Sequence, residues 1–191
     1  MRTETKDILK AWLALSVAFA ILLRGLRFDS GFIVAIGISA FTVGIGFLAH
    51  ELSHKFVAQR YGCWAEFRSF DAMLLIAIAM SFFGFILAAP GGVFIKGRGS
   101  LKHNGIISAA GPLASIVIAL VFLLLAIAVP IASVKQVVGY GFTINSWLAL
   151  FNMLPFAMLD GQKILSWSKP VYFTMLAVSI GLVFGLGAFA L

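Results

Sequence analysis

Charged residues are scarce in this sequence, which excludes an ordinary soluble domain. The 191 residues are 62% hydrophobic and only 11% charged, whereas about a quarter of a typical globular domain is charged. Acidic residues are the rarest, since seven Asp and Glu accompany fourteen Lys and Arg and leave a net charge of +7. The basic residues stand in short breaks between apolar runs, where they act as topology signals and contacts for anionic lipid. The composition therefore predicts a polytopic membrane protein and no nucleic-acid partner.

Cysteine is nearly absent as well. The single Cys63 excludes an internal disulfide and a cysteine-based metal cluster. We interpret it as a small apolar residue at an interface rather than as a reactive thiol.

Six apolar segments make up most of the chain, with no polar stretch long enough for a soluble domain. They cover residues 8–23, 32–56, 72–90, 105–130, 138–160 and 171–191. Backbone groups in lipid must satisfy their own hydrogen bonds, so spanning segments are expected to be α-helices. The first segment resembles a signal peptide, but Arg24 closes it and no small-x-small cleavage site follows. We therefore expect a single membrane-embedded domain of the all-α class over residues 1–191.

The stretch HELSH, residues 50–54, places three ionisable side chains in one turn of an apolar segment. Such groups are costly in hydrocarbon and indicate function. His50 and His54 are four residues apart, so on a helix they share one face and can bind one metal ion. Glu51 lies beside them, outside the ligand set but close enough to act on a water molecule. This is the HExxH pattern of zinc peptidases, in which the Glu is the general base.

The third zinc ligand has to be sought elsewhere, because a catalytic zinc site usually has three protein ligands and one open position. The spacing that metzincins require after HExxH is not met. Glu66 fits an interfacial loop, Asp71 fits a helix N-cap and His103 fits an exposed basic loop. Asp160 ends the apolar stretch FNMLPFAMLD, where an unpaired acid would be unusual. It is the best candidate for the third ligand.

HELSH in one apolar segment and NMLPFAMLDG in a later one resemble the site-2 protease family of intramembrane zinc metalloproteases. The stretch AAGPLAS at 109–115 resembles the Gly-Pro segment of that family, and the match covers about residues 32–165. The chain is similar to a minimal form of the family, without a PDZ or CBS domain. It differs from much of the family by the extra apolar segment 72–90.

The resemblance implies a role for each motif residue. His50, His54 and Asp160 would hold one Zn2+ per chain, and Glu51 would be the catalytic base. Asn152, eight residues before the Asp, would help to bind the substrate or the oxyanion. A helix–helix hydrogen bond is the alternative role for this Asn.

The extra segment 72–90 decides the expected topology. If it spans the membrane, the His50 and Asp160 motifs lie on opposite faces, and the basic residues divide equally between the two sides. If it dips in and returns, the two motif helices run parallel, and eleven of the fourteen basic residues lie on the N-terminal side. The positive-inside rule favours the second arrangement. We therefore expect about five transmembrane helices plus a re-entrant helix/β-strand element between the second and third.

This topology gives an expected location. The protein would be a multi-pass protein of the cell membrane with a cytoplasmic N-terminus. The active site would lie within the bilayer near the cytoplasmic face, where water is available for hydrolysis. Gly181 and Gly185 form a GxxxG pattern in the last segment, which fits either close packing inside the bundle or a face for a homo-oligomer.

The predicted function is hydrolysis of peptide bonds in or near the transmembrane segments of single-pass membrane proteins, as in regulated intramembrane proteolysis. Gly91, Gly92, Val93 and Phe94 are candidates for a strand that pairs with an extended substrate, and a plain loop over the site is the alternative. Two other classes of function stay open. One is a catalytically silent membrane scaffold with a relict metal site, and the other is a cation transporter that uses the His/Asp cluster.

Overall fold

The computed structural model describes residues 2–25, 27, 29–86, 90–97, 100–156 and 159–186. Its elements, with η for a π-helical turn, are α1 (Arg2–Arg24), α2 (Ser30–Ser39), η1 (Ala40–Gly44), α3 (Ile45–Arg60), β1 (Trp64–Ser69), α4 (Asp71–Ser81), β2 (Gly91–Lys96), α5 (Leu101–Ala128), α6 (Ala132–Asn152), α7 (Asp160–Trp167), α8 (Lys169–Ile180) and η2 (Gly181–Gly185). Arg98, residues 87–89 of segment 72–90 and the last five residues of segment 171–191 lie outside the described residues.

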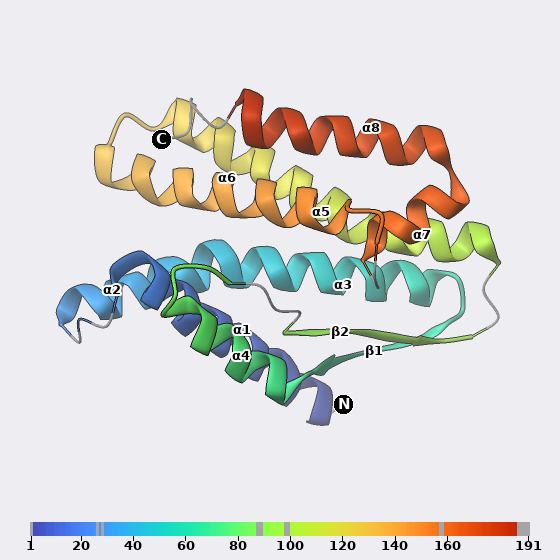
Figure 1. Ribbon diagram of the computed structural model, residues 1–191, viewed down its shortest axis with the longest axis horizontal. Coiled ribbons are helices and arrows are strands. Elements are labelled where there is room, and N and C mark those ends of the chain that lie inside the picture. Colours follow the sequence, from blue (N-terminus) through green and yellow to red (C-terminus); the bar gives the residue numbers. More distant parts are fainter. Residues whose placement is uncertain are drawn as a thin grey trace.

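The helix that carries HELSH lies in the middle of the molecule. α2, η1 and α3 follow one another without a break from Ser30 to Arg60. α5 and α6 lie on one side of this helix, with α7 and α8 packed on them, while α1, α4 and the two strands lie on the other side (Figure 1). The two histidines are therefore carried by an element that has protein on both sides.

Each side has its own apolar core. The larger core joins α5, α6, α7 and α8, and Phe142, Met153 and Ile164 are fully buried in it. The smaller core joins α1, α3, β1 and α4 around Phe47 and Phe67, whose rings meet edge to face at 6.0 Å. Burial of these side chains fixes the central helix between the two layers.

The two strands form a small antiparallel sheet that the sequence analysis anticipated only in part. β1 pairs with β2 from Trp64 opposite Lys96 to Ser69 opposite Gly91. The four residues proposed as a substrate strand all lie in β2, so this segment is a strand and not a plain loop. α4 lies between the strands in the chain, and the Phe70 N–H donates to the Pro90 carbonyl at 3.1 Å. β1 was not predicted.

The expected membrane topology is wrong. Within the described residues, two helices are long and apolar enough to cross a membrane, Ser30–Arg60 and Leu101–Ala128, and not about five with a re-entrant element. Apolar composition was not enough, because a span needs about 20 continuous apolar helical residues. α4 has 11 residues and is about 16 Å long. The charged residues of α1 stand near its ends and leave an apolar run no longer than residues 11–23, and α6 carries several polar residues.

The predicted apolar segment 138–160 is not one helix. α6 ends at Asn152, and Pro155 follows in the connecting turn. Proline has no N–H to continue the helical hydrogen bonds. Asp160 therefore starts the new short helix α7 rather than ending the long one.

The GxxxG pattern does not mark close packing inside this chain. Gly181 and Gly185 lie in η2, and a Cβ atom at either position would meet no atom of the described residues within 4 Å. The alternative of packing within the bundle is therefore not found in the described structure.

Candidate active site

Three side chains that are far apart in the sequence meet at the centre of the molecule. His50 and His54 project from α3, and Asp160 is the first residue of α7. Their exposed fractions are 2%, 8% and 7%. Asp160 Oδ2 lies 3.4 Å from His50 Nε2 and 3.0 Å from His54 Nε2. One ligand atom from each residue lies within 4.8 Å of the others, so this group can hold one metal ion.

Helix α5 orients both imidazole rings. His50 Nδ1 lies 3.0 Å from Ser115 Oγ, and His54 Nδ1 lies 2.7 Å from the Ile107 carbonyl oxygen. A carbonyl oxygen only accepts, so His54 Nδ1 carries the hydrogen and donates it. In a neutral ring this leaves the Nε2 lone pair free for a metal ion. Such a hydrogen bond at the other ring nitrogen is the usual support of a metal-binding histidine.

Gly111 lies beside the Nε2 atoms of His50 and His54, and its lack of a side chain leaves space there. This residue lies on α5, and a Cβ atom there would be 2.6 Å from His50 Nε2 and closer still to His54 Nε2. A larger residue would therefore occupy the position toward which both ligand atoms point. Two imidazole nitrogens, one carboxylate and this free space fit a catalytic zinc site.

Asp160 divides its two oxygen atoms between different partners. Oδ2 faces the histidines, while Oδ1 lies 3.9 Å from Lys163 Nζ. Burial alone would raise the pKa of the Asp160 carboxyl, but contact with the two imidazoles outweighs it and holds the pKa below its usual range. The neighbouring Gly161 fits closely against the end of α6, because a Cβ atom there would collide with the Met153 carbonyl.

The comparisons with known proteins decide the family. No family model and no solved structure matches the chain. The Methanocaldococcus jannaschii protein named "Putative zinc metalloprotease MJ0611" is 42% identical over 138 residues, which are 71% of this chain and 72% of that protein. The chain belongs to this zinc metalloprotease family. The resemblance carried by HELSH and NMLPFAMLDG is thereby confirmed. Together with the buried His–His–Asp group, membership supports zinc as the cofactor of this metalloprotease, as predicted.

The two other predicted site residues lie in α3 and at the end of α6. Glu51 is half-buried and close enough to His50, His54 and Asp160 to interact electrostatically with each. Asn152 is the last residue of α6, and its Nδ2 donates to the Leu148 carbonyl of the same helix at 2.9 Å. The helix–helix hydrogen bond considered as its alternative role is not present among the described residues.

The other candidates for the third ligand are engaged elsewhere. Glu66 lies 2.9 Å from an Arg68 guanidinium nitrogen. Asp71 is the first residue of α4 rather than its N-cap, and it lies 3.2 Å from Lys10 Nζ. His103 is stacked on an aromatic ring at a centroid distance of 4.4 Å. The choice of Asp160 by elimination agrees with this geometry.

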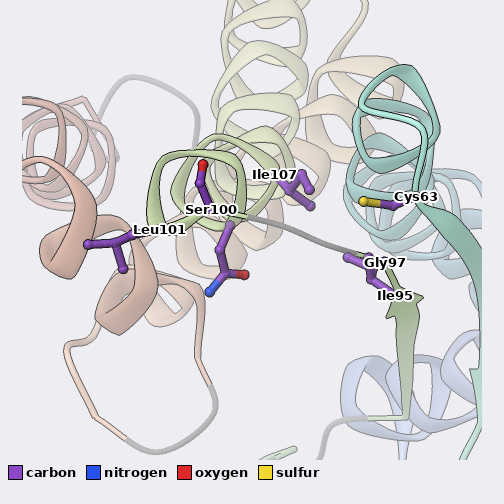
Figure 2. Close-up of a pocket in the computed structure, with 7 residues that line it drawn as sticks. Cys63, Ile95, Gly97, Ser100, Leu101 and Ile107 are labelled. Atoms are coloured by element: carbon purple, nitrogen blue, oxygen red, sulfur yellow. The ribbon is translucent and has the colours of Figure 1, made fainter.

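Two cavities lie close to the metal-binding group. One has a volume of about 350 Å³ and is bounded by Cys63, by the end of β2 and by the start of α5. Figure 2 shows Ile107, whose carbonyl holds His54, reaching from α5 toward Cys63. The other has a volume of about 410 Å³, is mainly apolar and is lined by α1, η1, α3 and α6. Phe47 and Phe151 line it, one turn or less from His50 and Asn152.

The sequence did not identify the residues of α5 that support the site. Ser115 and Gly111 both stand in AAGPLAS, a stretch that was noted only for its resemblance to the family. A Gly and a Ser in an apolar helix have no single meaning before their neighbours are known. The available signal was the presence of small and polar residues in AAGPLAS, a stretch of an apolar segment that packs beside the helix of the two histidines.

Proposed function

We propose that this metalloprotease hydrolyses peptide bonds of membrane-anchored proteins in or near their transmembrane segments, as a minimal intramembrane protease of the site-2 type. One observation carries the proposal: two members of the buried metal-binding group, His50 and His54, lie on a helix that is itself long and apolar enough to cross a bilayer. A peptidase that worked on soluble chains would have no need to place its ligands on such a helix.

The site residues have distinct roles in this proposal. His50 and His54, through Nε2, and Asp160, through its carboxylate, hold the zinc ion. Zinc bound there would polarise the scissile carbonyl and make water a better nucleophile at neutral pH. Glu51 accepts the proton of the attacking water and passes it to the leaving amine. Asn152 binds the substrate or the oxyanion through the part of its amide that its own helix leaves free.

The substrate is expected to be a single-pass membrane protein in an extended conformation. β2 uses one edge to pair with β1, and its other edge has no strand partner among the described residues. Gly91, Gly92, Val93 and Phe94 would pair with the unwound substrate along this edge. The apolar cavity between α1 and α6 would receive its hydrophobic side chains.

The charge at one end of the molecule supports an orientation. Arg60, Lys96 and Lys102 are exposed where α3 ends, β2 ends and α5 begins, and none has an ion-pair partner among the described residues. Lys96 lies over the ring of the half-exposed Trp64 at 5.6 Å. Basic and aromatic residues gather where a membrane meets the cytoplasm. We place this end, and with it the active site, near the cytoplasmic face of the cell membrane.

The test is cleavage in a membrane. The purified protein and a tagged single-pass reporter are reconstituted in vesicles, and products are followed with the wild type, Glu51→Gln and the control Glu66→Gln. We expect zinc in all three, cleavage by the wild type and by Glu66→Gln, and a fall of about 100-fold or more in Glu51→Gln because the base is removed. Undiminished cleavage by Glu51→Gln would contradict the mechanism.

The same experiment separates the two other classes of function. Zinc binding by the wild type without cleavage of any reporter would favour a silent scaffold. Movement of zinc across the vesicle membrane without cleavage would favour a cation transporter.

A further inference from the structure

The central helix has one irregular turn, and it lies just before the active site. η1, from Ala40 to Gly44, is a π-helical turn between two α-helical stretches. A π-helical turn adds one residue to the helix, and such turns are often found at functional sites. If this turn became α-helical, every residue after it would rotate by about 100° relative to α2. The direction in which His50 and His54 point therefore depends on η1.

Two side chains from neighbouring helices donate hydrogen bonds into this turn. Trp12 Nε1, on α1, donates to the Ala40 carbonyl at 3.0 Å. Asn145 Nδ2, on α6, donates to the Thr42 carbonyl at 3.3 Å and to the Gly141 carbonyl of its own helix at 2.8 Å. We name these bonds of Trp12 and Asn145 to η1 the π-turn contacts. They hold the turn from two opposite sides of the molecule, because α1 and α6 lie in different layers (Figure 1).

Two glycines make the approach of these side chains possible. A Cβ atom on Gly44 would collide with the indole of Trp12 at its Nε1, and a Cβ atom on Gly46 would collide with the amide of Asn145 at its Oδ1. Glycine weakens a helix interior, so a pair of glycines here indicates that close approach matters more than local helix stability. Each glycine matches one donor of the π-turn contacts.

Asn145 contacts the face of the helix that carries the metal ligands. Gly46, His50 and His54 follow one another at intervals of four residues, so they lie on one face. Asn145 is completely buried, and its Oδ1 has no hydrogen-bond partner among the described residues. A buried amide with an unsatisfied oxygen is a poor choice for stability alone. The presence of this amide is explained if its hydrogen bond to the Thr42 carbonyl serves to fix the central helix.

We propose that Trp12 and Asn145 are positioning residues that hold η1 in its π-helical form and thereby set the rotation of His50 and His54 about the helix axis. The inference rests on the proposed role of these histidines as zinc ligands. It predicts that the π-turn contacts affect the geometry of the metal site without touching the metal or the substrate.

The test uses the whole protein loaded with Co2+ in place of zinc. The visible absorption bands of Co2+ report the geometry of the ligands. Asn145→Leu and Trp12→Phe remove one donor each, and Gly46→Ala displaces the amide of Asn145 by another route. Thr143→Val is the matched control, since Thr143 lies on α6 like Asn145 and its hydroxyl has no hydrogen-bond partner among the described residues. Zinc affinity, kcat, KM and the unfolding temperature are measured beside the spectra.

We expect altered cobalt bands in all three variants. Zinc binding should be about tenfold weaker, which is typical when residues that support the ligands of a metal site are removed. The kcat should fall while KM and the unfolding temperature of Asn145→Leu stay close to the wild type. The Thr143→Val protein should match the wild type throughout. If one variant fails to fold, the other two carry the comparison, because each of the three changes a different residue at or beside η1.

Two negative outcomes have different meanings. If the wild type binds cobalt and the variants keep its spectrum and affinity, the π-turn contacts do not position the ligands and this inference is wrong. If the wild type binds no metal, the proposed ligand set itself is wrong, and this inference is withdrawn with it.

Discussion

The central helix carries two buried polar clusters, and different partners satisfy them. At η1, the N–H donors of Trp12 and Asn145 meet backbone carbonyls, so these donors are satisfied within the protein. About two to three turns later, the Nε2 atoms of two histidines and a carboxylate oxygen point at one another. If both rings are neutral and carry their hydrogen on Nδ1, these atoms are all acceptors and only a cation or a proton can satisfy them. The first cluster is therefore suited to fixing geometry and the second to chemistry.

The largest expected effect comes from removing one ligand of the second cluster. His54→Ala and Asp160→Ala should each lose most of the zinc, which we expect at about one ion per chain in the wild type, and should lose peptidase activity with it. Metal content of the dialysed protein measures this directly. His103→Ala is the control and should keep its zinc, since that ring is stacked away from the site.

Filling the space at the ligands should have the next largest effect. Gly111→Ala would place a methyl group against both Nε2 atoms, and we expect zinc binding to weaken by about 100-fold, at the upper end for disturbed metal surroundings. Competition with a chelator gives the affinity. Gly37→Ala is the control and should bind zinc as the wild type does, because a Cβ atom at Gly37, in α2 of the central helix, meets no atom of the described residues within 4 Å. Equal affinities in the two variants would show that Gly111 is not part of the site.

Removing a partner of one imidazole should have a smaller effect. Ser115→Ala takes away the group 3.0 Å from His50 Nδ1, so the ring loses its orientation but stays in place. We expect about tenfold weaker zinc binding and a similar loss of activity, measured by the same chelator titration. Ser166→Ala, which removes an exposed hydroxyl on α7, should change neither quantity.

The smallest expected effect lies outside both clusters, at the contact between α1 and the end of α3. Glu4 Oε1 accepts from Lys55 Nζ at 2.5 Å and from the Phe67 N–H at 3.0 Å. Burial alone would raise the pKa of Glu4, but these two donors outweigh it and lower the pKa. The charge of Glu4 therefore stabilises the folded protein fully at pH values above about 4.3, the pKa of Glu in an unfolded chain. This stabilisation is lost as the pH falls through the lower pKa that Glu4 has in the folded protein.

Glu4→Gln should therefore unfold more easily than the wild type at pH 7, by about 1 kcal/mol. Thermal unfolding in detergent at several pH values should show this difference shrinking below about pH 4. Asp71→Asn removes an exposed ion pair with Lys10 and should have almost no effect. A difference for Glu4→Gln that is the same at all pH values would show that the charge of Glu4 is not what stabilises the contact.

Local features of the site could be predicted from the sequence. The spacing of His50, Glu51 and His54 has a fixed meaning on any helix, and the segment is apolar enough to be read as helical. Asp160 could be chosen as the third ligand by elimination, because so hydrophobic a chain has few other acidic residues. The structure brings these residues together as expected.

Features that depend on distant contacts could not be predicted. Trp12, Gly111, Ser115 and Asn145 matter because of the side chains opposite them, and a single sequence does not show which helix faces which. The number of spanning helices was overestimated for a related reason, since hydrophobicity alone does not show where a helix ends. The break between Asn152 and Asp160 had a local signal in Pro155, which the prediction of one apolar segment over 138–160 overlooked.

X-ray absorption at the zinc edge tests the central claim most directly, because it reports the atoms around the metal in the intact protein. The account predicts nitrogen and oxygen neighbours only, at about 2.0–2.2 Å, including the outer-shell scattering of two imidazole rings. Asp160→Ala should lose the signal together with the zinc. A sulfur neighbour at about 2.3 Å, which only a cysteine would supply, or an unchanged spectrum at full zinc content in Asp160→Ala, would contradict the assignment of His50, His54 and Asp160.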